Sequence, residues 1–166
     1  MARRRKEQVP VRRLTKNRII TIGALAAIAS AAGYFGLNSM IPVNGSSPAF
    51  AFPNNHYIKA AHDKSGYIYV SQSSGAVKGI RTSAGGSLVD PTYTFQKDEL
   101  ESVHFINEDY DTHSEHNFNI DEFNVHTHDL KYFESQTITF IADKPGTYRY
   151  YCTIHPEMKG NIVIEG

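Results

Sequence analysis

No charged side chain occurs between Arg18 and Lys59, and the first 25 residues of that interval, 19–43, are almost entirely apolar. A helix needs about 20 apolar residues to cross the ~30 Å hydrocarbon core of a bilayer. Eight basic side chains and one acid lie before this stretch, within residues 1–18, and such clusters stay on the cytoplasmic side. We therefore predict a basic cytoplasmic head over 1–18, a transmembrane anchor or signal segment over 19–43, and an exported body.

Two interpretations of the 19–43 segment are open, a retained anchor and a cleaved signal peptide. Ala49-Phe50-Ala51 fits the small-residue pattern of a cleavage site, but the apolar run is longer than the about 7–15 residues usual in a signal peptide. The pair Arg12-Arg13 partly resembles a twin-arginine export signal, but we favour the interpretation of an ordinary positively charged flank. In each case the part after residue 43 lies outside the cytoplasm, membrane-anchored or secreted after cleavage.

The zero net charge of the chain hides an uneven distribution of charge. Residues 1–18 carry eight basic side chains and one acid, a net +7, so the remaining nine basic and sixteen acidic side chains leave −7 for 19–166. The basic head orients the apolar segment 19–43 in the membrane, which is the partner that we predict for that segment. We expect no nucleic-acid partner.

Beyond residue 60 the sequence consists of short alternating runs rich in Tyr, Val, Ile, Phe and Thr, separated by clusters of Gly, Asp, Asn and Ser. This pattern is typical of strands joined by turns. It predicts an all-β fold over 66–166, an antiparallel sandwich with Greek-key connections, preceded by a linker over 44–65 that begins with a flexible tether at 44–48. The predicted strands are Tyr67–Ser71, Ala76–Thr82, Thr92–Phe95, Ser102–Asn107, Asn117–Asp121, Thr137–Ala142, Thr147–Tyr151 and Asn161–Glu165, with turns at 73–75, 85–86 and 144–146.

The only cysteine, Cys152, stands at the end of the predicted strand Thr147–Tyr151. A single cysteine excludes an intramolecular disulfide and any zinc site built from two or more cysteines. Alternation places Tyr148, Tyr150 and Cys152 on one face of the strand, which we expect to be the core face. A buried free cysteine behaves as a small hydrophobic residue, unless other metal-binding side chains lie nearby.

Further donors follow Cys152 in the same loop. His155 and Met158 stand three and six residues after it, so a thiolate, an imidazole and a thioether occur at three-residue intervals. Soft sulfur donors select copper, and a trigonal site of two histidines and one cysteine with a weak axial methionine needs one more histidine. His116, at a loop-to-strand boundary, is the best candidate for it, and His113 in the same loop is its rival.

The sequence G-T-Y-R-Y-Y-C-T-I-H-P-E-M-K-G at 146–160, with H-N-F-N-I-D at 116–121 before it, resembles the copper site of the cupredoxins, the type 1 blue copper proteins. The short C-T-x-H-P-x-M loop is most similar to that of amicyanin, and plastocyanin shares its plan with a longer loop. The resemblance implies a Greek-key cupredoxin β-sandwich, one copper ion that alternates between Cu(I) and Cu(II), and a hydrogen bond between Asn117 and Thr153. The ligands that it implies are His116, Cys152, His155 and, in the axial position, Met158.

The other histidines and the acids have simpler interpretations. His126 and His128 form an H-x-H pair such as multicopper oxidases use, but the H-C-H element that completes those sites is absent, so we expect both side chains to be exposed. His104 is expected to pack within its strand. The acids before His116 either favour copper capture or a basic partner, or form a solvated loop; they are Glu108, Asp109, Asp111 and Glu115.

We therefore expect a membrane-tethered type 1 copper protein that carries single electrons between a respiratory-chain donor and acceptor on the periplasmic or outer face of the cell membrane. It would not itself be an enzyme. One alternative is a copper-binding and delivery protein, from which the metal leaves. Another is an oxidase-associated domain like cytochrome oxidase subunit II, from which this chain departs because that domain uses two cysteines. A nitrite reductase or laccase-like enzyme would need further copper ligands and further domains.

Overall fold

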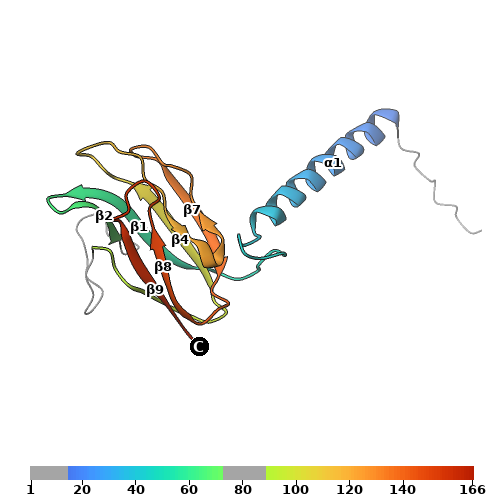
Figure 1. The fold of residues 1–166 in the computed structure, drawn as a ribbon. Coiled ribbons are helices and arrows are strands. Elements are labelled where there is room, and N and C mark those ends of the chain that lie inside the picture. Colours follow the sequence, from blue (N-terminus) through green and yellow to red (C-terminus); the bar gives the residue numbers. More distant parts are fainter. Residues whose placement is uncertain (1–14, 73–88) are drawn as a thin grey trace, which may run out of the picture. The chain divides into compact units, whose positions relative to one another are not determined.

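The computed structural model describes residues 15–72 and 89–166, which fall into two units, one up to Ser39 and one from Met40 to Gly166 (Figure 1). The predicted strand Ala76–Thr82 and the predicted turns at 73–75 and 85–86 lie outside the described residues, as does most of the basic head.

The described part of the first unit is essentially one helix, α1, which spans Lys16–Ser39 and has no buried residue. The Thr21 hydroxyl donates to the Asn17 carbonyl at 2.9 Å, and the Ser30 hydroxyl bonds within the helix in the same way, so these polar groups are satisfied locally. By length and composition α1 can cross a membrane. This agrees with the apolar helix expected around 19–43, and the crossing itself stays a prediction.

The second unit is a sandwich of two β-sheets (Figure 1). One sheet has the strand order β2-β1-β4-β7 and the other β3-β9-β8-β5-β6. Most predicted strands within the described residues agree with observed ones to within a few residues, and the all-β sandwich is confirmed. The strands are β1 (Asn54–Asp63), β2 (Gly66–Gln72), β3 (Tyr93–Gln96), β4 (Leu100–Asn107), β5 (Asn119–Ile120), β6 (Val125–His126), β7 (Ser135–Ile141), β8 (Gly146–Tyr151) and β9 (Lys159–Glu165), with a 3₁₀ turn (Asp121–Phe123) between β5 and β6.

Strand β1 lies within residues 44–65, which we predicted to be a linker. Ile58 and Ala60 of β1 are buried in the core, and the Lys59 ammonium between them donates to Glu108 at 3.0 Å. The charged and polar residues of this strand hide its alternation of buried and exposed positions. β1 pairs with β2 on one side and with β4 on the other. The four-stranded sheet therefore depends on residues that precede 66.

Two strand pairs are parallel, where the sequence predicted an antiparallel sandwich. β1 runs parallel to β4 and β3 runs parallel to β9, whereas the remaining named pairs are antiparallel. Side chains alternate between the two faces in both kinds of ladder, so the period of the sequence does not reveal strand direction. The direction depends on how the chain crosses between the sheets.

Asn44, the first residue of the expected flexible tether 44–48, and Val43 before it are hydrogen-bonded to β7, an edge strand of the four-stranded sheet. The Val43 N–H donates to the Thr139 carbonyl at 2.8 Å. The Asn44 side chain accepts from the Ile141 N–H at 2.9 Å and donates to the Ile141 carbonyl at 2.7 Å. These bonds satisfy backbone groups that an edge strand otherwise leaves open, so this part of the connection belongs to the sandwich.

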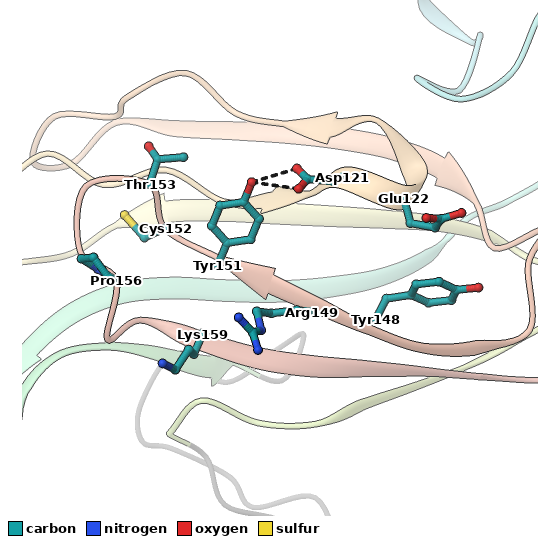
Figure 2. Close-up of a pocket in the computed structure, with 9 residues that line it drawn as sticks. All are labelled: Asp121, Glu122, Tyr148, Arg149, Tyr151, Cys152, Thr153, Pro156 and Lys159. Carbon is teal, nitrogen blue, oxygen red and sulfur yellow. Dashed lines mark hydrogen bonds between the residues drawn. The ribbon is translucent and has the colours of Figure 1, made fainter.

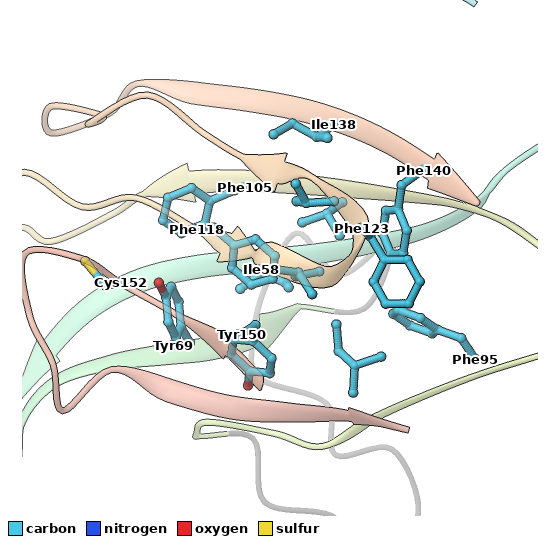
Figure 3. Close-up of a cluster of buried hydrophobic side chains, with 14 of the residues drawn as sticks. Ile58, Tyr69, Phe95, Phe105, Phe118, Phe123, Ile138, Phe140, Tyr150 and Cys152 are labelled. Atoms are coloured by element: carbon cyan, nitrogen blue, oxygen red, sulfur yellow. The ribbon is translucent and has the colours of Figure 1, made fainter. Parts of the chain in front are cut away.

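Aromatic side chains from both sheets fill the space between them (Figure 3). Burying a side chain of this size contributes roughly 1.5–3 kcal/mol, so the cluster stabilises the contact between the sheets. Cys152 lies at one end of it, beyond Tyr69 and Phe118, and shares the buried face of β8 with Tyr150 as predicted. The largest aromatic members are Tyr69, Phe105, Phe118, Phe123, Phe140 and Tyr150.

Candidate metal centre

Three side chains with metal-binding atoms lie together at the end of the core where β8 ends. The ligand atoms of His116, Cys152 and His155 all lie within 4.8 Å of one another. Cys152 Sγ is 4.0 Å from His155 Nδ1, and the ring centroids of His116 and His155 are 4.6 Å apart. Among the described residues this is the one group of three or more His, Cys, Asp or Glu side chains placed to hold a metal ion.

A short loop between β8 and β9 carries two of these side chains. The Cys152 N–H donates to the Met158 carbonyl at 3.1 Å, and the Met158 N–H donates to the His155 carbonyl at 3.0 Å. Tyr151 and Lys159 pair at the ends of the two strands, directly outside the loop. Because the loop is closed by these bonds, its three donor residues are kept close together before any metal binds.

Met158 is completely buried and belongs to the hydrophobic core cluster. It lies at the end of the loop, directly before β9, and its backbone contacts that of Cys152. A thioether is a soft donor, so a buried methionine at this place fits the predicted axial ligand. Its role as a ligand stays a prediction.

His116 comes from a different part of the chain and is held from two sides. Its backbone exchanges two hydrogen bonds with Leu130, at 3.1 and 2.8 Å. Its Nε2 lies 3.2 Å from Oδ2 of Asp109, and both side chains are fully buried. The other ring nitrogen, Nδ1, is buried and has no hydrogen-bond partner.

The unpartnered Nδ1 of His116 is the feature that best fits a metal ion. An ionised carboxylate only accepts hydrogen bonds, so the Nε2 that faces Asp109 carries the proton and Nδ1 keeps a free lone pair. A buried acceptor without a partner costs about 1–3 kcal/mol, which a metal bound at Nδ1 would recover. The residues present therefore fit an ion held by two imidazoles and one thiolate.

The protonation states also favour metal binding. Burial is the main cause that lowers the pKa of His116, against an opposing hydrogen bond from Asp109, and burial likewise lowers the pKa of His155. Burial by itself would raise the pKa of Asp109, but hydrogen bonds from Thr112, His116 and Ser114 outweigh it and place that pKa below its ordinary value. Neutral imidazoles are the forms that bind metals.

The predicted hydrogen bond between Asn117 and Thr153 is confirmed. Asn117 Nδ2 donates to Thr153 Oγ1 at 2.5 Å, and the Thr153 N–H donates to Asn117 Oδ1 at 2.8 Å. The same side chain donates to Asp129 Oδ1 at 2.6 Å and accepts from Asn119 Nδ2 at 2.7 Å. Asn117 directly follows His116, and Thr153 directly follows Cys152. The buried amide of Asn117 thus links the two segments that carry these donors.

The burial of Asp109 contradicts the interpretation of the acids before His116 as a solvated loop. The sequence allowed for a solvated acidic loop over 108–115, yet Asp109 is fully buried and bonds to His116. The available signal was the spacing of Asp109 and Thr112, because an aspartate often accepts hydrogen bonds from residues two or three positions later in a turn.

Tyr67 in β2 is a second residue of the site that the sequence did not indicate. Its ring centroid lies 3.8 Å from that of His155 and 5.3 Å from that of His116, and its hydroxyl lies 3.0 Å from Ser114 Oγ. The alternating pattern placed Tyr67 in a strand, but no local pattern connects that strand to a loop far along the chain.

The other histidines lie outside the donor group. His113, the rival of His116, is exposed and stacks on Tyr132 with ring centroids 4.4 Å apart. His126 and His128 are exposed, as predicted. His104 is partly buried in its strand, as predicted, and both of its ring nitrogens bond to neighbouring side chains.

An open groove lies beside Cys152 at the end of β8 (Figure 2). Tyr151 stands within it and donates from its hydroxyl to the Asp121 carboxylate, at 2.8 and 3.1 Å from the two oxygens. Arg149 and Lys159 lie on the other side of Tyr151. Cys152 is the one residue that the groove shares with the donor group, so the groove is a surface next to the candidate metal centre.

Residues 86–164 match the family model of the cupredoxin-like domain. The matched residues include the Cys152 loop, so the match agrees with the resemblance of that loop to the cupredoxins. No curated protein matches the chain.

Several solved structures are similar to the chain at low identity. A variant of the McoA multicopper oxidase from Aquifex aeolicus is 17% identical, with a TM-score of 0.47, over 70% of this chain and 28% of its own. The copper nitrite reductase from Nitrosomonas europaea is 19% identical, with a TM-score of 0.46, over 69% and 42%. Auracyanin from Roseiflexus castenholzii is 21% identical, with a TM-score of 0.42, over 66% and 97%. The chain thus spans less than half of the length of the two enzymes.

Proposed function

We propose that this protein is a membrane-tethered type 1 copper protein that carries single electrons between redox partners outside the cytoplasm. In this proposal His116, Cys152 and His155 bind one copper ion, and Met158 is the axial ligand. The convergence of three ligand atoms within 4.8 Å, in a chain with a cupredoxin-like domain, carries the proposal. Bound copper would supply a one-electron couple between Cu(I) and Cu(II).

The residues around the donors support electron carriage because they hold the donors in place. An electron carrier is served by ligands that move little between the two oxidation states. Backbone bonds close the loop of Cys152, Leu130 fixes the backbone of His116, and Asn117 joins the two segments. Cys152 and His116 are buried, whereas His155 is partly exposed, so we propose that electrons enter and leave at the His155 edge.

The tether and the partners extend the same proposal. The helix α1 supports a membrane anchor, which would hold the domain on the periplasmic or outer face of the cell membrane. A respiratory-chain donor and acceptor would then exchange electrons with it. As a carrier the protein converts no substrate, so we propose that it is not an enzyme.

Copper titration of the full chain in detergent tests this proposal. Adding Cu²⁺ should produce the intense thiolate-to-copper charge-transfer band, and Cys152→Ser should abolish it. His116→Ala should also remove the band, while His113→Ala serves as the matched control and should retain it. A wild-type protein without the band would refute the type 1 assignment. If the band forms but repeated reduction and reoxidation release the metal, copper delivery replaces electron carriage.

The tether has a separate test. Sequencing the N-terminus of the mature protein should find the α1 residues retained. A mature protein that starts at Phe52 would show cleavage after Ala51 and would replace the anchor with a signal peptide.

A further inference from the structure

We infer that Asp109 is a positioning residue of the copper site: its buried carboxylate fixes His116 with the proton on Nε2 and lowers the reduction potential of the bound copper. This inference rests on the proposed function. Asp109 lies outside the loop around Cys152, seven residues before His116, and the acids Asp111 and Glu115 between the two are exposed.

The carboxylate of Asp109 is built into the fold. Its Oδ2 lies 3.2 Å from His116 Nε2 and accepts a second bond from the Ser114 N–H at 3.2 Å. Its Oδ1 accepts from the Thr112 N–H at 3.1 Å, and the Thr112 hydroxyl donates to Oδ2. Four donors thus converge on one buried carboxylate, which has little freedom to turn away from His116.

A second buried side chain, Asn107, holds the ends of this segment. Its Oδ1 accepts from the Asp109 N–H at 3.0 Å. Its Nδ2 donates to the Ser114 carbonyl at 2.7 Å and to the Leu130 carbonyl at 2.8 Å. The Leu130 carbonyl also accepts from the His116 N–H. Asn107 therefore couples the position of Asp109 to the position of the His116 backbone.

The hydrogen-bond pattern sets the tautomer of His116. An ionised carboxylate has no proton to donate, so Nε2 must be the N–H donor and Nδ1 the free acceptor. Nδ1 is the buried atom without a partner, and it belongs to the ring that packs against His155. A carboxylate that bonds the outer nitrogen of a metal-binding histidine orients the ring and raises its basicity. The four hydrogen bonds that the Asp109 carboxylate accepts stabilise its ionised form.

The charge of Asp109 has a consequence for the redox equilibrium. Cu(II) carries one more positive charge than Cu(I), so a fixed negative charge nearby stabilises the oxidised ion more than the reduced ion. Inside a protein this interaction is screened less than in water. Asp109 therefore favours Cu(II) binding over Cu(I) binding, and removing its charge should raise the reduction potential.

The test removes the negative charge of Asp109 and keeps the shape of its side chain. In the copper-loaded full chain, Asp109→Asn should lower the ratio of Cu(II) to Cu(I) binding constants tenfold or more, which is a rise in potential of at least about 59 mV for one electron. Its Cu(II) affinity should fall about 10- to 100-fold. Asp111→Asn is the matched control, since it removes the same charge from an exposed position of the same loop, and its potential should stay near that of the wild type.

A measurement on the metal-free wild-type chain covers the case in which Asp109→Asn does not fold. Nitrogen-15 NMR should find the His116 proton on Nε2, and a proton on Nδ1 would overturn the inference. Equal potentials for Asp109→Asn and Asp111→Asn would also overturn it, while the charge-transfer band of the wild type would leave the proposed function standing. If the wild type shows no such band, the proposed function fails, and the tautomer still decides whether Asp109 positions His116.

Discussion

Replacing Asn117 with alanine removes four side-chain hydrogen bonds at once: two with Thr153, one to Asp129 and one from Asn119. A single bond of this kind contributes about 0.5–1.5 kcal/mol to stability. Thr153 and Asp129 are exposed, so water replaces much of what they lose. We therefore expect the free energy of unfolding to fall by about 2 kcal/mol, at the lower end of the sum.

The same substitution should weaken copper binding, because it separates the segment of His116 from the loop of Cys152. Loss of a side chain that holds ligands typically costs about 10- to 100-fold in metal affinity. Competition with a chelator measures the affinity. Urea unfolding of the metal-free full chain, followed by near-ultraviolet circular dichroism of the buried tyrosines Tyr69 and Tyr150, measures the stability.

Asn161→Ala is the matched control, because Asn161 is exposed on β9 and such substitutions usually change stability by less than about 0.5 kcal/mol. If Asn117→Ala unfolds as the control does and binds copper as the wild type does, the amide link has no part in holding the site.

Three further predictions concern pH and packing. Burial lowers the pKa of His116 and His155 in the metal-free folded protein. As pH falls below about 6.5, the unfolded chain therefore binds more protons than the folded chain, and the folded state loses stability. Identical thermal melts at pH 7.5 and pH 5 would contradict this. Phe140→Ala should cost about 3–5 kcal/mol in urea unfolding, because the ring is fully buried, and a loss below 1 kcal/mol would mean that the core closes over the space. Gly160→Ala would place a Cβ 2.1 Å from the Tyr150 hydroxyl. This clash should lower the free energy of unfolding by about 1–3 kcal/mol and change the tyrosine signal in near-ultraviolet circular dichroism. An unchanged signal together with an unchanged stability would refute the clash.

The candidate site was predictable where its donors are close in sequence. Cys152, His155 and Met158 lie within one short loop, and that loop closes on itself through its own backbone bonds. His116 was the best candidate because it stands at a loop-to-strand boundary, and the family resemblance supported that choice, but His113 in the same loop stayed its rival. The structure separates the two histidines through their surroundings, since His116 is buried beside Asp109 and His113 is exposed.

The sandwich class was predictable because alternation along a strand is a local property. The pattern did not extend to β1, where Lys59 and other polar residues interrupt the apolar positions although Ile58 and Ala60 are buried. It also could not anticipate that residues 43–44 dock on β7, because the partners of Asn44 lie almost a hundred residues later in the chain. Contacts of this kind leave no period in the sequence.

By itself, the sequence determined the apolar helix, the alternating strands and the order of donors around Cys152, because each of these depends on spacing within a few residues. The tertiary structure alone decided which distant side chains surround those donors. Tyr67 comes from β2 and Asp109 from the loop after β4, and neither belongs to a pattern that includes Cys152. Their places follow from how the two sheets pack, which sets the burial of each side chain and therefore its hydrogen bonds and its charge.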